Sequence, residues 1–285
     1  LYGSRGANGV IIITTKQGEQ NSKATVKVKA SLGGSNRAVR DYDRVSTNQY
    51  FELYWEALRN RYAGSPDYTP ATAAAQASKD LVTKLMGGGP NPYGPQYAQP
   101  VGTDGKLVEG ARPLWDSDWS DAMEQQALRT ELNLSVSGGG KANQYFFSAG
   151  YLNEKGILEG TYFKRYSFRA NIDNQIRSWL NVSANISYSD NIGNTGIISG
   201  TGANRGGVVL SVINTPTYAP IWDPEKPNQY NKNFYGVNIM NPMENLARQK
   251  NNKNKENRLI ASGAATISFL PNLKLKSSVA LDRRN

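Results

Sequence analysis

The chain has 285 residues, a net charge of +10 and a pI near 9.6, and it contains neither cysteine nor histidine. Without these two residue types it cannot form disulfides, thiolate metal sites, common catalytic triads or histidine general bases. The basic residues are dispersed, and no RNA-recognition, helix-turn-helix or zinc-finger pattern accompanies them. We therefore expect a protein that is not an enzyme, with no catalytic residue, metal site, cofactor or nucleic-acid partner.

The chain opens with LYGSRGANGVIIITTKQG, a stretch that joins regularly spaced glycines to an apolar run. Gly3, Gly6 and Gly9 can adopt positive φ or let another backbone come close. Val10 to Ile13 is apolar without alternation, which predicts a short strand buried on both faces. The spacing is not that of a nucleotide-binding loop, because neither G-x-G-x-x-G nor GK[ST] is present. The stretch therefore predicts a glycine turn that leads into a buried strand.

Strict alternation of apolar and polar residues then recurs along the chain, which is typical of half-exposed antiparallel strands. The first such strand, Ala24 to Leu32, is about as long as a membrane-crossing β-strand, roughly 9–11 residues. Its apolar face carries alanine, valine and leucine, and its other face carries threonine, lysine and serine. Six further strands are predicted around residues 132–137, 145–151, 166–172, 180–188, 259–269 and 273–281.

Two long segments, 33–129 and 190–257, interrupt these strands. In the first, Ser46 and Gln49 resemble a capping box before a helical pattern, and a second helix is predicted from Thr69 to the glycines after Met86. The run PLWDSDWSDAM predicts a short helix or turn before the next strand. The second segment is a polar excursion rich in Asn, Gly and Pro. No run approaches the ~20 apolar residues of a membrane-spanning helix.

The predicted connections alternate between tight turns and longer loops. In a meander, this alternation puts every tight turn at one end of the sheet and every longer loop at the other. Outer-membrane barrels show this segregation, with short periplasmic turns and long outer loops. A soluble sandwich has no reason to segregate its loop lengths. The pattern therefore favours an all-β, transmembrane antiparallel barrel.

The opening stretch, Leu1 to Gly18, resembles the signature at the end of the plug domain in SusC/RagA-type TonB-dependent outer-membrane transporters, and a second similarity covers Leu132 to Tyr188. The resemblance implies a plugged barrel of about 22 strands, of which about seven are present here. It assigns residues 1–20 to the C-terminal end of the plug domain and 21–285 to the N-terminal part of the barrel, with outer loops at the two long segments. Because seven strands leave an open edge in lipid, we expect a piece of a longer protein.

The resemblance also implies a function. A member of this family imports an oligosaccharide or a peptide across the outer membrane of a Gram-negative bacterium, driven by TonB and gated by the plug. Its implied partners are a SusD-like surface lipoprotein that acts as a lid, and outer-membrane lipid. Arg5 is a candidate to pair with a carboxylate where plug and barrel meet, as an alternative to a simple exposed arginine. The plug signature falls on Tyr2, Gly3, Ser4, Arg5, Gly6, Ala7, Asn8 and Gly9.

Aromatic residues of the predicted outer loops are candidates for contacts with ligand or lid, because exposed aromatic clusters mark binding sites. The alternative is that they pack the loops against themselves. The candidates are Tyr93, Tyr97, Trp115, Trp222, Tyr230 and Tyr235.

Three other interpretations remain open at this point. Asp116, Asp118 and Asp121 form D-x-D-x-x-D, but the rest of a calcium loop is missing. A passive outer-membrane porin or a surface adhesive β-protein is an alternative to a gated transporter. A carboxylate-based glycosidase is a third class, for which the sequence shows acidic pairs but no measure of their separation.

Overall fold

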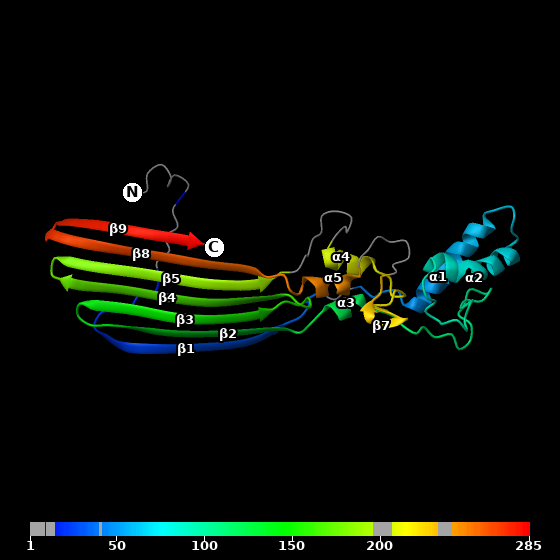
Figure 1. Ribbon diagram of the computed structural model, residues 1–285, viewed down its shortest axis with the longest axis horizontal. Coiled ribbons are helices and arrows are strands. Elements are labelled where there is room, and N and C mark those ends of the chain that lie inside the picture. Colours follow the sequence, from blue (N-terminus) through cyan, green and yellow to red (C-terminus); the bar gives the residue numbers. More distant parts are fainter. Residues whose placement is uncertain (1–8, 10–14, 40–41, 196–206, 233–240) are drawn as a thin grey trace.

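The computed structural model describes residues 9, 15–39, 42–195, 207–232 and 241–285. Seven long strands form one antiparallel sheet, in which each strand pairs with the next one of the sheet along the chain (Figure 1). This is the predicted number of strands, and the fold is mostly antiparallel β-sheet. The strands are β1 (Ser22–Ser35), β2 (Ala127–Gly139), β3 (Asn143–Lys155), β4 (Tyr162–Arg177), β5 (Leu180–Asn194), β8 (Asn254–Leu270) and β9 (Leu273–Arg284).

The remaining elements lie beyond one end of this sheet, in the two long connections (Figure 1). None of the described helices is long and apolar enough to cross a membrane. These elements are α1 (Thr47–Ala63), α2 (Pro70–Met86), α3 (Trp119–Met123), α4 (Gly207–Asn214), α5 (Pro242–Gln249) and the hairpin of β6 (Trp222–Asp223) and β7 (Lys226–Tyr230).

The connections are segregated by length, as predicted. The tight turns at 140–142, 178–179 and 271–272 all lie at one end of the sheet, called here the turn end. The connections 36–126, 156–161 and 195–253 lie at the other, called here the loop end (Figure 1). A meander produces this arrangement only if every second connection is the long one, because successive antiparallel strands return to the same end.

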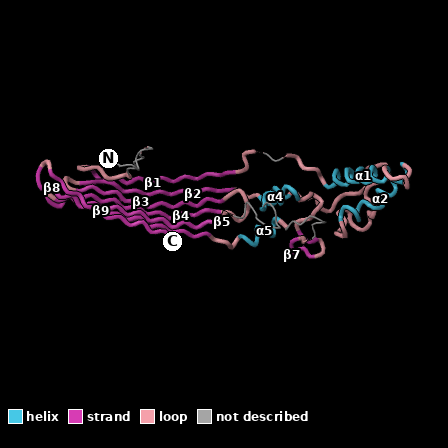
Figure 2. Tube along the Cα trace, turned by 90° about the horizontal axis from the view of Figure 1, so that it is seen from above, coloured by secondary structure: helices cyan, strands magenta, loops and turns pink. Residues whose placement is uncertain are grey.

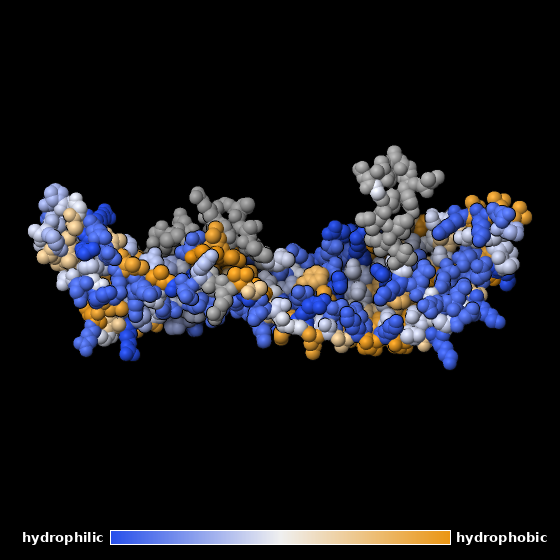
Figure 3. Space-filling model, turned by 180° about the vertical axis from the view of Figure 1, so that it is seen from behind, coloured by the Kyte–Doolittle hydropathy of each residue, from blue (hydrophilic) through white to orange (hydrophobic). Residues whose placement is uncertain are grey.

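One face of the sheet is apolar along continuous rows that cross all the strands. Cross-strand pairing aligns one such row through every strand without interruption by a polar residue. Side chains in this row share a face because residues directly opposite one another in paired strands point the same way. Many apolar side chains of this face are exposed, and apolar and hydrophilic groups both reach the surface of the sheet (Figure 3). The row consists of Val26, Val136, Phe147, Ala170, Ile186, Ala261 and Leu281.

The opposite face is polar in the neighbouring row, shifted by one residue along each strand. Burying this set of charges and hydroxyls in lipid would be costly, whereas contact with water satisfies them. The two faces therefore require different solvents. The row consists of Lys27, Ser135, Ser148, Arg169, Ser187, Ile260 and Asp282.

The first long connection folds around the helix pair α1–α2, and both helices begin as predicted. Ser46 and Gln49 form the capping box of α1, and Thr69 caps α2 with Pro70 in its first turn. Phe51 and Trp55 of α1 and Leu81 of α2 are buried in one core together with loop residues. This connection is an ordered unit with a core of its own.

A hydrogen bond between the two helices shifts the pKa values of both side chains that form it. Tyr62 of α1 donates to an Asp80 carboxylate oxygen of α2 at 2.6 Å. This bond raises the pKa of Tyr62 to about 12 and lowers the pKa of Asp80, whose carboxylate also accepts from Gln76.

The structure differs from the sequence prediction in two respects. The strands extend further at the loop end, so that β1 continues through Gly33 and Gly34 to pair with β2. The polar segment after β5 was predicted without helices, but it contains α4, α5 and the β6–β7 hairpin. Buried side chains of α3, α4 and α5 form a second core around Trp119, which alternation and composition alone do not reveal. The predicted strand at residues 10–13 lies outside the described residues.

Candidate functional site

The segment that precedes β1 lies against the polar face of the sheet. Asn171 of β4 donates from Nδ2 to the backbone carbonyl of Lys16 at 2.6 Å and to the Thr15 hydroxyl at 3.3 Å. Asn171 belongs to the polar face, yet only 4% of its surface is exposed. The segment runs toward the turn end of the sheet before the chain enters β1 (Figure 2). The chain therefore reaches its first strand from the polar side.

Close backbone packing holds the end of this segment. A Cβ at Gly18 would overlap the carbonyl oxygens of Gly138 and Tyr145, and one at Gly139 would overlap the carbonyl oxygens of Asn143 and Glu19. Only residues without a side chain permit this approach. A backbone hydrogen bond from Asn21 to the Gly140 carbonyl then completes the reversal into β1 at 3.1 Å.

A cavity of about 410 Å³ adjoins this contact on the polar face. Thr15 and Gln17 line one side of it, and the opposite side comes from β4, β5 and β8. Arg169 is the charged residue of this lining. The cavity therefore separates part of the incoming segment from the sheet, while Asn171 bridges the two. The residues of the polar face that line it are Arg169, Asn171, Asn185, Ser187, Ile260 and Ser262.

The predicted ligand contact Tyr93 needs correction. Its side chain is 0% exposed and packs edge-on against Phe51, with the ring centroids 5.0 Å apart. Its hydroxyl donates to Asn48 at 2.8 Å, and burial raises the pKa of Tyr93 well above its usual range. Because no surface remains for a ligand, Tyr93 packs the loop against itself, which is the alternative interpretation of these aromatics. Tyr97 is half-buried at the edge of the same core.

Two other predicted aromatics meet at one cleft of about 570 Å³. Trp115 is half-buried, and its indole nitrogen donates to the Tyr218 carbonyl at 2.7 Å. Trp222 is 48% exposed and lines the same cleft. Behind it, Tyr230 stacks on its ring across the β6–β7 hairpin, with the centroids 4.5 Å apart and the planes at 18°. Burial, with nearby Glu159 and Glu244, raises the pKa of Tyr230.

Aspartates also line this cleft, and Asp116, Asp118 and Asp223 accept hydrogen bonds from backbone amides. Asp116 accepts from the backbone amide and hydroxyl of Thr47, both at 2.9 Å, and so ties the loop to the start of α1. Asp118 caps α3 by accepting from two backbone amides at 3.0 Å. Asp121 and Asp223 complete the acidic lining. The described part of the chain contains no cluster of acidic, histidine or cysteine side chains that could hold a metal ion.

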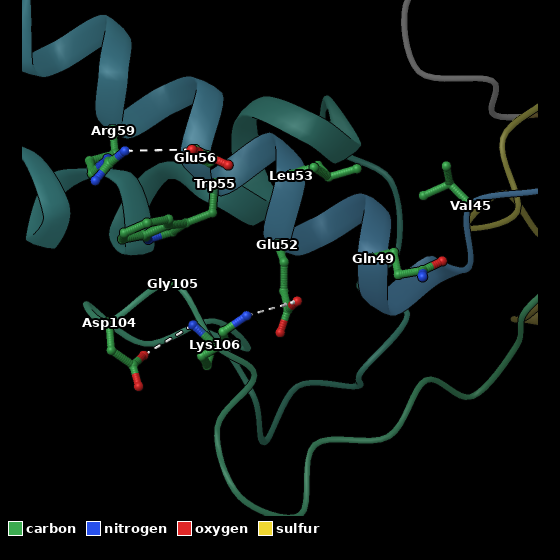
Figure 4. Close-up of a pocket in the computed structure, with 10 residues that line it drawn as sticks. All are labelled: Val45, Gln49, Glu52, Leu53, Trp55, Glu56, Arg59, Asp104, Gly105 and Lys106. Carbon is green, nitrogen blue, oxygen red and sulfur yellow. Dashed lines mark hydrogen bonds and ion pairs between the residues drawn. The ribbon is translucent and has the colours of Figure 1, made fainter.

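A third hollow, about 480 Å³ in volume, lies between α1 and the loop at 104–106 (Figure 4). Glu52 of α1 faces Lys106 there, at 3.8 Å between carboxylate and ammonium. Trp55 is buried, and its indole nitrogen donates to the Ser78 hydroxyl at 2.8 Å. Gly105 has a φ of +79° and lies against the Trp55 ring, where a Cβ would collide. These contacts hold the loop against the helix, so we interpret the hollow as part of the packing between them and not as a ligand site.

Sequence reasoning missed Asn171 as the residue that holds the incoming segment. Alternation placed it on the polar face, but nothing in the sequence distinguishes it from the other asparagines of that face. Of the predicted plug signature, only Gly9 lies within the described residues, and it has a φ of +100° with open space around it. Residues 2–8, including Arg5, and the candidate Tyr235 lie outside the described residues.

The comparisons with known proteins point to one group of relatives. No family model matches the chain. A TonB-dependent receptor of Formosa agariphila is 24% identical over 286 residues, which covers 100% of this chain and 22% of the relative. The TonB-dependent receptor SusC of Bacteroides thetaiotaomicron is 26% identical over 300 residues, which covers 98% of this chain and 24% of the relative. The chain thus spans about a quarter of the length of these relatives.

Solved structures show the same fold. The RagAB peptide importer in its closed-closed state matches with a TM-score of 0.67 at 23% identity, covering 100% of this chain and 30% of the importer chain. The open-open state of that importer also matches with a TM-score of 0.67 and covers 99% of this chain. The resemblance to SusC/RagA-type TonB-dependent receptors, predicted from the opening stretch, is therefore confirmed and extends over the whole chain.

Proposed function

We propose that this chain is part of a TonB-dependent transporter that imports a nutrient across the outer membrane of a Gram-negative bacterium. In this proposal residues 1–20 are the end of a plug domain, and residues 21–285 are part of the barrel wall. The observation that carries it is the position of the segment at 15–21, held on the polar face of the sheet by Asn171. A plug inside a barrel must reach the first strand from that side.

The two faces of the sheet support the same proposal. The apolar rows suit lipid, and the polar rows suit a water-filled lumen in which a plug and a solute can move. A seven-stranded sheet with two open edges would leave backbone groups unpaired in lipid, at a cost of several kcal/mol each. The proposed barrel is therefore closed by strands that this sheet does not contain.

The proposed transport cycle follows from this arrangement. Ligand is captured at the loop end between the outer loops and a SusD-like lipoprotein lid, and force from TonB on the plug opens a path along the polar face. The relatives' names support TonB dependence, and the neighbouring structures are named as a peptide importer and transporter. The substrate class proposed here is an oligosaccharide or a peptide.

Solute flux through the full-length protein in liposomes distinguishes a gated transporter from a passive porin. We expect small sugars to be retained inside liposomes that contain the transporter without TonB, because the plug occupies the lumen. Free diffusion of those sugars would contradict gating and favour the porin. The control is a variant that lacks the plug domain, which should release the sugars.

Replacement of Asn171 by alanine should loosen the segment that enters β1. The Lys16 carbonyl would lose its part-buried hydrogen bond to the Asn171 side chain, which contributes about 0.5–1.5 kcal/mol. Amide hydrogen exchange at residues 15–19 of the full-length protein should accelerate by about 2- to 12-fold, while exchange within β4 stays unchanged. Asn185→Ala is the matched control, because Asn185 lies beside Asn171 in the same polar row and contacts Ser262 instead. Equal exchange in both variants would contradict the assigned role.

Replacement of Ile186 by lysine should prevent stable insertion, because Ile186 lies in the middle of the apolar face. A lysine on the lipid side near the midplane costs about 2–4 kcal/mol. The control is Ser187→Lys on the same strand, which directs the charge to the polar face and should be tolerated. Folding yields in lipid vesicles measure the difference, and equal yields would show that this face does not contact lipid.

The cleft that contains Trp222 is the proposed ligand or lid contact at the loop end. Replacement of Trp222 by alanine removes its exposed ring and should weaken binding by about 2- to 12-fold, since aromatic stacking contributes about 0.5–1.5 kcal/mol. Titration calorimetry with panels of oligosaccharides and peptides, with and without the lipoprotein, measures the loss. Leu53→Ala changes another exposed apolar residue of the same loop region and should have no effect. Unchanged binding in both variants would remove the cleft from the proposal.

A further inference from the structure

The charged residues of the apolar face are concentrated toward the loop end of the sheet. Where the seven described strands pair regularly, the side chains of this face include five charged residues, and all of them lie on the loop-end side of the row that contains Ile186. Toward the turn end, Arg177 lies opposite Leu180 at a pairing irregularity, and the regularly paired rows in between carry no charge. Four of the five residues are cationic, namely Lys155, Lys164, Lys255 and Arg283, and the fifth is Asp190.

The cations adjoin a group of tyrosines on the same face. Tyr151 and Tyr166 are opposite one another in β3 and β4, with ring centroids 5.2 Å apart. Tyr162 pairs with Lys155, and its ring lies 5.7 Å from the Lys164 ammonium. Tyrosines of outer-membrane barrels lie at the boundary between hydrocarbon and headgroups. The lysines next to them are therefore at headgroup level, and the apolar rows around Ile186 lie below them in the hydrocarbon.

Lys164 and Lys255 are the centre of this group. They occupy one cross-strand row, on either side of Ile192 of β5. Two strand spacings of about 4.8 Å put their backbones roughly 10 Å apart, which is within the reach of two lysines toward one phosphate group. Neither lysine forms an ion pair with another residue that the structure describes, and the same holds for Lys155 and Arg283.

The acid on this face does not neutralise the group. Asp190 lies one row closer to the turn end than Lys164 and Lys255, and its Oδ1 has no hydrogen-bond partner. Four cations and one carboxylate leave a formal charge of +3 on this part of the face. By contrast, Arg258 and Arg284 on the polar face are paired with Asp282 and Glu256. The cations without an ion pair are therefore on the face of the sheet that the proposed function assigns to lipid.

We propose that Lys155, Lys164 and Lys255 bind the phosphate groups of membrane lipids in the leaflet at the loop end. The inference rests on the proposed function, because it requires this face to contact the membrane. Lysine and arginine form charge-assisted hydrogen bonds with phosphate oxygens. Their aliphatic stems also lie along the apolar surface while their charged ends reach the headgroups.

The test measures which lipid the full-length transporter retains. The protein is equilibrated with equal amounts of a phosphate-bearing lipid and an uncharged glycolipid that has the same acyl chains, and bound lipids are counted by native mass spectrometry. The wild type should retain the phosphate-bearing lipid preferentially. The double variant Lys164→Gln, Lys255→Gln should lose about 30-fold of that preference, at about 1 kcal/mol for each lysine. Inorganic phosphate in excess should not displace the retained lipid.

Two further variants separate a charge effect from a folding defect. Lys164→Arg with Lys255→Arg keeps the charge and should keep the preference. Lys27→Gln with Lys29→Gln removes two cations from the polar face and should also keep it. An unchanged preference in the Lys164→Gln, Lys255→Gln variant, or an equal loss in the polar-face variant, would overturn the inference while the transporter assignment stands. A wild type that inserts into no membrane would overturn the proposed function and this inference together.

Discussion

In-register pairing across seven strands is the constraint on which both surfaces of the sheet depend. Side chains alternate along each strand, and pairing extends that alternation sideways into rows. A slip of one residue between two strands would move every later apolar side chain to the opposite face. The irregularities in pairing lie near the turn end, close to Thr25, Gln175 and Ser268, so the rows through Val26 and Lys27 continue from edge to edge.

The difference between the two faces determines on which face of the sheet the segment at 15–21 lies. Its backbone carbonyl at Lys16 needs a donor, and the polar face supplies one in Asn171. An apolar face offers no such donor, and this part-buried hydrogen bond is the contact that favours the polar side. The glycines at positions 18 and 139 then allow the segment to lie on the backbone of the β2–β3 turn. The polar face therefore decides on which side of the sheet the segment lies, and the two glycines allow its backbone to come close to the backbone of the β2–β3 turn.

The long connections at the loop end are stabilised mainly by two hydrophobic cores of their own. The α1–α2 pair and the cluster around Trp119 each bury apolar residues from sequence-distant segments. Aromatic side chains divide accordingly between two roles. Tyr93 and Trp55 are buried and hold loops in place, whereas Trp222 is supported by Tyr230 and remains half exposed. Residue type alone does not separate these roles, because both sets are aromatic residues in polar loops.

The sequence by itself determined the strands, their number, the segregation of turns from loops and the caps of α1 and α2. Each of these follows from local rules, since a two-residue period, a tight turn and a capping box involve only residues close in the chain. The sequence did not determine α4, α5 or the β6–β7 hairpin, because their stabilising partners are distant in the chain. It also could not distinguish Asn171 from other asparagines, or Tyr93 from Trp222. Those differences come from burial and from the partner each side chain meets, and only the tertiary structure decides which residues meet.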